Sequence, residues 1–273
     1  MLIIGHREVR DILKGKEPEI LQVVADAHRL YGEGLAGPSG SVCEGTTRAG
    51  AGIVLGSPAD GSPEVFVEAS IILAKRAGAS AGLAAGLLRT EPEPRGLALV
   101  GLGPVNLEVL RFVKARFHSL IELTVFDPDE ERAIVFAREA RKIVPGAAVH
   151  YAETPEEAVA AHKLVSLSAT ATTPHPGPQA ARPGTTVLDW AEPAARAGDF
   201  RAPSIGALLR DPGGVRPDPD RVTVCSPSGP AALDLALARW VADQAQRWRI
   251  GVRIDDFLPA TLTAPAVPVT TSV

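Results

Sequence analysis

Residues 97–106 read LALVGLGPVN, an apolar run that passes directly into a glycine-rich turn. The first glycine of such a turn permits a sharp change of direction between strand and helix, and the second lets the backbone approach a pyrophosphate. A proline is tolerated at the first helical position, where its missing N–H costs little. Asn106 stands where a third glycine usually allows close packing of helix on strand. The pattern predicts a dinucleotide-phosphate site at Gly101, Gly103, Pro104, Val105 and Asn106.

A second apolar stretch, residues 122–126, ends at Asp127. A carboxylate at the end of the second strand of such a unit accepts hydrogen bonds from the adenosine ribose hydroxyls. The same carboxylate repels the 2′-phosphate of NADP, and no arginine immediately follows it. Together the two motifs predict NAD as the cofactor. The alternative is a glycine turn in an α/β protein that binds no nucleotide.

Strand and helix patterns alternate around this motif. We expect strands at residues 65–67, 97–100, 122–126, 147–151, 164–168, 185–188 and 221–225, and helices at residues 6–13, 19–31, 70–88, 105–116, 129–142, 155–161 and 231–247. The glycine- and serine-rich residues 32–61 indicate weak strands and loops. Such alternation predicts an α/β fold, with a Rossmann-type parallel sheet domain and a smaller α+β domain for substrate binding and dimerisation. The two prolines within residues 91–94 interrupt the helical pattern and mark the expected boundary between the two domains.

Composition excludes several classes of function. The formal net charge of the 273 residues is −4, so no basic field favours binding to nucleic acid or to an anionic membrane. Two distant cysteines, Cys43 and Cys225, do not form a disulfide framework, which favours a reducing cytoplasm. We find neither a signal-peptide pattern nor an apolar run of membrane-spanning length. The Pro- and Thr-rich residues 259–273 indicate a loosely ordered or extended arm.

The segment at residues 101–112 resembles the corresponding part of the ornithine cyclodeaminase/μ-crystallin family. Further agreement occurs at residues 67–80, 165–174, 226–229 and 254–259 and at Asp234. The sequence is most similar to the branch that makes 2,3-diaminopropionate, in which an N-(2-amino-2-carboxyethyl)-glutamate intermediate is oxidised with NAD. The resemblance implies a substrate and dimerisation domain formed by residues 1–92 with 228–273, and an NAD-binding Rossmann domain at residues 93–227. It also implies a ligand site in the cleft between the domains.

The sequence departs from the family pattern at two places. Family members carry a substrate lysine in their N-terminal half, but this chain has no lysine between Lys16 and Lys75. After Leu188 one strand of the family pattern is missing. A missing charge partner indicates a substrate with one fewer anionic group, or no chemistry at all. We therefore expect poor or absent activity on ornithine, even with NAD bound.

Three residues are candidates for the substrate chemistry. Arg76 matches the family arginine that holds the substrate carboxylate, a task suited to a planar bidentate guanidinium. The alternative is a surface arginine on an Ala-rich helix. Asp189 and Glu192 follow a predicted strand on the ligand-facing side of the sheet, and either one is a candidate acid or base at the substrate amine. The alternative for both is an ordinary loop acid.

Two hydroxyl groups are candidates for the nicotinamide pocket. Thr170 and Ser228 are of a type that bonds a carboxamide, although Ser and Thr also commonly cap helices and turns. The histidines show no metal-ligand spacing, and Cys43 has no paired histidine signature, so we expect no metal site.

Three functions remain open at this point. The first is an NAD-dependent oxidoreductase that acts at the carbon–nitrogen bond of an amino acid, with hydride transfer between the substrate Cα and nicotinamide C4. The second is a non-catalytic homologue that binds NAD or a small ligand. The third is redox-neutral cyclodeamination with tightly held NAD. For each of them we expect a homodimer, because two-fold dimers are the commonest oligomers and the Ala/Gly-rich residues 70–88 offer a surface for close packing.

Overall fold

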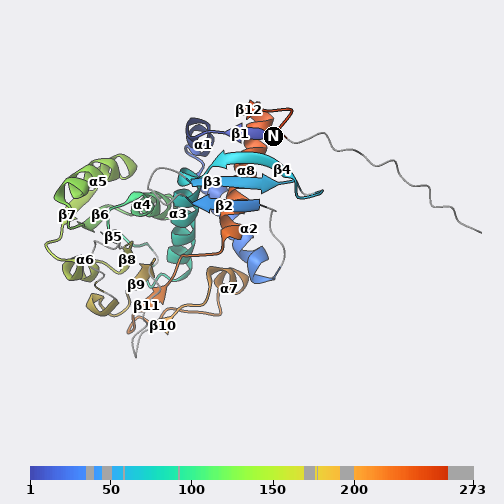
Figure 1. The fold of residues 1–273 in the computed structure, drawn as a ribbon. Helices are drawn as coiled ribbons and strands as arrows, with labels where there is room; N and C mark the ends of the chain where they lie inside the picture. Colours follow the sequence, from blue (N-terminus) through green and yellow to red (C-terminus); the bar gives the residue numbers. More distant parts are fainter. Residues whose placement is uncertain are drawn as a thin grey trace, which may run out of the picture.

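The computed structural model (Figure 1) describes residues 1–34, 40–44, 51–57, 59–91, 93–168, 176, 178–190 and 200–257. The described residues form two sheets, and a long helix, α3 (Ser70–Leu87), lies between the sheets. The expected α/β class, with a parallel sheet and a second smaller sheet, is confirmed. No helix in the described ranges is long and apolar enough to cross a membrane.

The larger sheet is parallel throughout and has the strand order β10-β11-β9-β8-β5-β6-β7. Its strands are β5 (Gly96–Val100), β6 (Glu122–Phe126), β7 (Ala148–Tyr151), β8 (Leu164–Leu167), β9 (Thr186–Asp189), β10 (Phe200–Arg201) and β11 (Thr223–Cys225). The chain adds β6 and β7 on one side of β5, and then β8 and β9 on the other. The strand order therefore reverses between β5 and β8, which is where open α/β sheets bind ligands.

Helices cover both faces of this sheet. The covering helices include α4 (Pro104–Arg116), α5 (Glu130–Ile143), α6 (Pro155–Ala161) and α7 (Ile205–Arg210). Leu97 and Leu99 of β5 join the core cluster that includes α4 and α5, whereas Ala98 and Val100 join the cluster that includes α6. This alternation follows from the two-residue period of a strand. The strand reads as a continuous apolar run because both of its faces are buried.

The smaller sheet is mixed and has the order β12-β1-β4-β3-β2. Its strands are β1 (Leu2–Ile4), β2 (Gly40–Glu44), β3 (Ala51–Gly56), β4 (Pro63–Glu68) and β12 (Val252–Arg253). Helices α1 (His6–Leu13), α2 (Glu17–Gly32) and α8 (Ala231–Trp248) pack with it around a second core cluster. The two ends of the described chain meet here, since the Met1 amino group donates to the Ile254 carbonyl at 2.7 Å.

The small residues of α3 pack against α4 within the same chain. A Cβ atom at Gly78 would lie 2.7 Å from the Glu108 backbone, and one at Gly82 would lie 3.2 Å from Phe112 Cβ. The glycines therefore permit close approach of the two helices. The chain uses these small residues for its own helix packing, so they give no separate support for the expected dimer.

Most expected elements are present with ends shifted by a few residues. The structure adds β1, β10, β12 and α7, which the sequence pattern did not predict. It also turns the weak signals within residues 32–61 into the antiparallel pair β2 and β3. The residues 259–273 lie outside the described ranges.

Candidate functional site

The turn between β5 and α4 has the conformation that its glycines predict. Gly101 has φ +80°, which strains any residue with a Cβ. Its N–H donates to the Phe126 carbonyl at 2.9 Å, so the turn is tied to the end of β6. At Gly103 a Cβ atom would meet no atom of the described residues within 4 Å. This part of the structure therefore leaves open space at the glycine over which a pyrophosphate would pass.

The N-terminus of α4 is suited to an anion. Gly103 is the N-cap residue and Pro104 follows it, and no side chain of the described residues caps this end of the helix. Helix N-termini present unpaired N–H groups and the positive end of the helix dipole. The open glycine and the uncapped helix together fit the phosphates of a dinucleotide.

Asn106 replaces the third glycine for a reason that the structure supplies. Its side chain is buried, and its Nδ2 donates to the carbonyls of Val100 and Gly101 at 2.9 and 2.8 Å. Its Oδ1 accepts a hydrogen bond from Ser166 Oγ at 2.7 Å, and that hydroxyl accepts one from Trp190 Nε1 at 3.2 Å. The amide thus ties the ends of β5 and β8 together. Its polar atoms already have protein partners, so any contact of Asn106 with a cofactor would come from its backbone.

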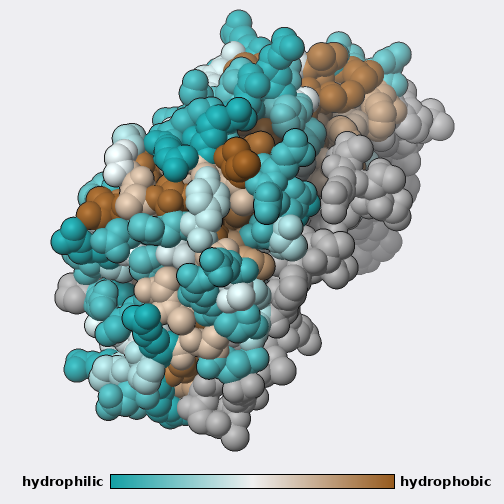
Figure 2. Space-filling model, turned by 90° about the vertical axis from the view of Figure 1, so that its left-hand side faces the viewer, coloured by the Kyte–Doolittle hydropathy of each residue, from teal (hydrophilic) through white to brown (hydrophobic). Residues whose placement is uncertain are grey.

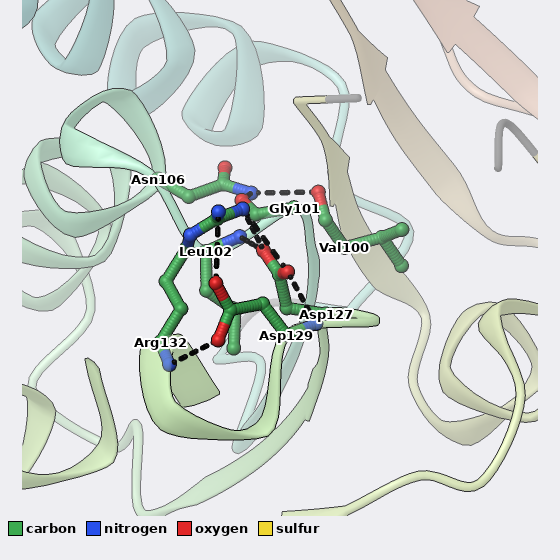
Figure 3. Close-up of polar contacts among 7 residues, drawn as sticks. All are labelled: Val100, Gly101, Leu102, Asn106, Asp127, Asp129 and Arg132. Carbon is green, nitrogen blue, oxygen red and sulfur yellow. Dashed lines mark hydrogen bonds and ion pairs between the residues drawn. The ribbon is translucent and has the colours of Figure 1, made fainter. Parts of the chain in front are cut away.

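Asp127 lies beside the glycine turn, as expected, but it is covered (Figure 3). Its Oδ2 accepts from the Leu102 N–H at 2.8 Å, and its Oδ1 accepts from the Asp129 N–H at 3.0 Å. Arg132 Nη1 lies 3.1 and 3.3 Å from the two Asp127 oxygens, and Nη2 lies 3.1 Å from Asp129 Oδ2. Sequence reasoning considered only the residues immediately after Asp127 and missed this arginine, which the first turn of α5 brings back to the strand end.

A cavity of about 660 Å³ adjoins this carboxylate. Its walls come from the end of β6, the first turns of α5 and the segment after β7, and include Pro128, Ile134 and Tyr151. Figure 2 shows the side of the molecule that carries α5, β7 and α6, where hydrophobic residues form small areas separated by hydrophilic ones. The cavity provides room and apolar surface next to the expected ribose position.

Arg76 lies in α3 and is largely covered, so it is not a surface arginine. Its Nε donates to Asp234 Oδ1 of α8 at 2.7 Å, and the two side chains are 12% and 7% exposed. Arg76 Nη1 is buried and has no hydrogen-bond partner within the described ranges. A buried donor without a partner costs free energy, which an anionic ligand would recover.

His28 of α2 adjoins the same part of α3. Its Nε2 lies 3.0 Å from Ser80 Oγ, and both side chains are buried. Burial, with a smaller contribution from the Arg76 charge, lowers the pKa of His28 to about 4. The imidazole is therefore neutral at physiological pH. Sequence reasoning treated His28 as an ordinary histidine, because nothing in the pattern places α2 against the helix that carries Arg76.

Lys75, the neighbour of Arg76 in sequence, has a different role. Its Nζ lies 3.1 Å from Glu108 Oε2 and 3.4 Å from Glu17 Oε1, and it lies 5.6 Å from the centre of the Phe112 ring. These contacts join α3 to α2 and α4. The lysine is occupied in holding these helices together.

The remaining candidates are placed as follows. Asp189 is fully buried at the end of β9, on the same edge of the sheet as Gly101 and Asp127. Ser228 is exposed in the segment between β11 and α8. Thr170 and Glu192 lie outside the described residues. Within the described ranges no group of three His, Cys, Asp or Glu side chains is arranged to hold a metal ion.

Solved structures similar to this chain include several enzymes of amino-acid metabolism. CmnK has a TM-score of 0.78 at 20% identity, over 95% of this chain and 99% of that chain. An archaeal alanine dehydrogenase dimer with bound NAD has a TM-score of 0.78 at 18% identity, over 94% and 99%. The Thermococcus litoralis Δ1-pyrroline-2-carboxylate reductase, in complex with NADH and L-proline, has a TM-score of 0.76 at 18% identity, over 93% and 100%. At these identities the likeness shows a shared fold.

The comparison with curated proteins found no match. A family model does match, over residues 37–188, which is more than half of the chain. The matched segment contains Arg76, the glycine turn and Asp127. The chain therefore belongs to the ornithine cyclodeaminase/mu-crystallin family.

Proposed function

We propose that this protein is an NAD-dependent oxidoreductase that acts on the carbon–nitrogen bond of an amino acid or an N-carboxyalkyl amino acid. Family membership and the similarity to dehydrogenases and reductases of amino-acid metabolism support the reaction class. The open turn at Gly103, the uncapped start of α4 and the carboxylate at the end of β6 support a dinucleotide.

The observation that carries the proposal is the largely covered Arg76 guanidinium. Its Nε is paired with Asp234, while the buried Nη1 has no hydrogen-bond partner among the residues that the structure describes. A substrate carboxylate would supply the missing acceptor, and Arg76 would fix the orientation of the substrate Cα. Helix α3 packs closely on α4, whose first residues follow the glycine turn. The packing holds the carboxylate clamp and the dinucleotide turn in a fixed relation.

The dinucleotide would be held by Gly101, Gly103, Pro104, Val105 and the backbone of Asn106, with Asp127 at the ribose. When bound, its nicotinamide supplies the acceptor or donor of a hydride. Thr170 and Ser228 remain our candidates for the carboxamide. Asp189 and Glu192 remain our candidates for holding the proton of the substrate amine, and the burial of Asp189 at the ligand edge of the sheet supports its inclusion.

The substrate is expected to differ from ornithine. No lysine in the N-terminal half stands where the family pattern has its substrate lysine, and Lys75 is occupied by Glu17 and Glu108. We therefore retain 2,3-diaminopropionate-type chemistry on an N-carboxyalkyl amino acid, in specialised metabolism within the cytoplasm, as the preferred assignment.

The proposed domain division assigns residues 1–92 and 228–273 to substrate binding and dimerisation and residues 93–227 to the cofactor. The pairing of β12 with β1 and the packing of α8 on α2 and α3 support it, since they join the C-terminal part to the N-terminal part. The homodimer also remains a proposal. The archaeal alanine dehydrogenase of similar fold is described as a dimer.

The test is NADH formation across a panel of amino acids and N-carboxyalkyl amino acids, with calorimetric titration of NAD alongside it. We expect turnover of one member of the panel, weak or absent turnover of ornithine, and loss of turnover in Arg76→Lys, whose single ammonium cannot make the bidentate contact. Arg29→Lys is the matched control, because Arg29 pairs with Asp26 on the exposed side of α2.

The three functions give different results in this assay. NAD binding without turnover of any substrate would favour the non-catalytic homologue. Ammonia release and ring formation without net NADH would favour the cyclodeaminase. Robust turnover of ornithine would contradict our interpretation of the missing lysine.

A further inference from the structure

At the end of β6 the Arg132 guanidinium lies against the Asp127 carboxylate (Figure 3). The Asp127 side chain is 0% exposed, whereas that of Arg132 is 35% exposed. Each Asp127 oxygen also accepts one backbone N–H, from Leu102 and from Asp129. Of the two paired side chains, only the Arg132 guanidinium is therefore open to solvent at this strand end.

Two carboxylates neutralise this guanidinium. Nη1 bonds both oxygens of Asp127, and Nη2 bonds Asp129. The three side chains together carry one more negative than positive charge, and Glu130 and Glu131 follow in the first turn of α5. In this state the position tolerates the uncharged ribose hydroxyls and disfavours a dianionic phosphate.

We propose that Arg132 is the specificity-determining residue of the ribose site, and that Asp127 holds it in an NAD-selective state. The inference rests on the proposed function, because it requires a dinucleotide at this turn. Without the Asp127 carboxylate, Arg132 keeps its bond to Asp129 and presents Nη1 to a 2′-phosphate. Arginine pairs with phosphate through two N–H groups, which makes it the usual partner of the 2′-phosphate of NADP.

This arrangement predicts that removal of the Asp127 carboxylate reverses the preference for NAD over NADP and does not merely abolish it. If the carboxylate acted alone, its removal would weaken the binding of NAD and leave the affinities for NAD and NADP nearly equal. With Arg132 beside it, removal of the carboxylate leaves a cation aimed at the 2′ position. Asp127→Ser is therefore expected to prefer NADP.

The test is a double-mutant cycle of the wild type, Asp127→Ser, Arg132→Gln and the double variant, titrated calorimetrically with NAD and NADP. We expect Asp127→Ser to bind NAD about tenfold more weakly and NADP about tenfold more tightly than the wild type, because NAD loses one charge-assisted hydrogen bond and NADP acquires one. The double variant should lose the gain in NADP affinity. Adenosine 5′-monophosphate and adenosine 2′,5′-bisphosphate, titrated in parallel, should repeat the pattern without the nicotinamide.

Asp127→Asn is included as a second variant in case the serine variant does not fold. Its amide oxygen can still accept a hydrogen bond from the Leu102 or the Asp129 N–H. An equal gain in NADP affinity with and without Arg132 would overturn the inference, as would an unchanged preference in both Asp127 variants. These outcomes leave the proposed function standing if the wild type binds NAD. A wild type that binds neither cofactor would overturn both.

Discussion

The two ends of the candidate site are built in opposite ways. The dinucleotide end uses one continuous stretch, β5-α4-β6-α5, and its key contact joins Leu102 to Asp127, 25 positions apart. The carboxylate end joins Arg76 to Asp234, 158 positions apart, and His28 to Ser80, 52 positions apart, through helices α2, α3 and α8. The first end is fixed by local backbone geometry, and the second exists only when the whole chain is folded.

This difference has consequences for stability. At the dinucleotide end the phosphates would meet backbone atoms and an uncapped helix start, and the one buried carboxylate, Asp127, has two backbone N–H donors and a partly exposed arginine as partners. At the carboxylate end an ion pair and a neutral histidine are buried together. Substitutions at the carboxylate end are therefore expected to reduce the free energy of unfolding, whereas those at the dinucleotide end mainly change ligand binding.

The largest effect is expected for Arg76→Leu. It leaves the Asp234 carboxylate buried without this guanidinium, and breaking a buried pair costs about 3–5 kcal/mol. Urea unfolding would measure the loss. Arg29→Leu is the control, since its pair with Asp26 is exposed and is worth about 0–1 kcal/mol. A similar small loss in both variants would contradict the idea that the carboxylate end depends on buried charge.

The dinucleotide end is more predictable from the sequence than the carboxylate end, because its residues lie closer together in the chain. The glycine turn and Asp127 were identified from residue pattern and context alone, because strand, turn and helix signals lie together in the chain. Arg76 was found only through the family resemblance, and its ion pair with Asp234 was not predicted. No local pattern reports that α2, α3 and α8 converge.

At the dinucleotide end the roles of two side chains, Asn106 and Arg132, were not predicted. Asn106 was assigned to the cofactor, yet its amide bonds the end of β5 and the Ser166 hydroxyl of β8. Arg132 was overlooked because it is 5 positions beyond Asp127 in the sequence, and only the helical turn returns it to the strand end. Short strands such as β10 and β12 were missed since two residues carry no periodicity.

A pH dependence of stability is expected from His28 and is the next largest effect. Its pKa is lowered from 6.5 to about 4 in the folded protein, so the unfolded chain binds the proton more readily. Stability should therefore be unaffected by His28 above about pH 6.5 and fall by up to about 1.4 kcal/mol per pH unit as pH drops toward 4. Chemical unfolding at several pH values would measure the slope.

His28→Gln is the matched variant for that experiment, because glutamine can still bond Ser80 but does not titrate in this range. The wild type should lose more stability than the variant between pH 6.5 and 4.5. The nearby Arg76 and Asp234 are present in both proteins, so a difference between the two profiles is assigned to residue 28. If the two proteins lost stability equally with falling pH, protonation of His28 would not be coupled to folding.

The smallest effect on stability is expected at the dinucleotide end, from two alanine substitutions two residues apart. Gly101→Ala forces a Cβ into φ +80° and should cost about 1–2 kcal/mol. Gly103→Ala places its Cβ where no atom of the described residues lies within 4 Å, so its cost should be only the roughly 0.5–1 kcal/mol by which alanine is a poorer N-cap than glycine. The order reverses for ligand binding, since the new methyl group of Gly103→Ala occupies the approach to the pyrophosphate. We expect that variant to bind NAD at least about tenfold more weakly, because displaced phosphate contacts are charge-assisted. Thermal unfolding and NAD titration of both variants would separate the two effects, and unchanged NAD affinity in a folded Gly103→Ala would place the pyrophosphate elsewhere.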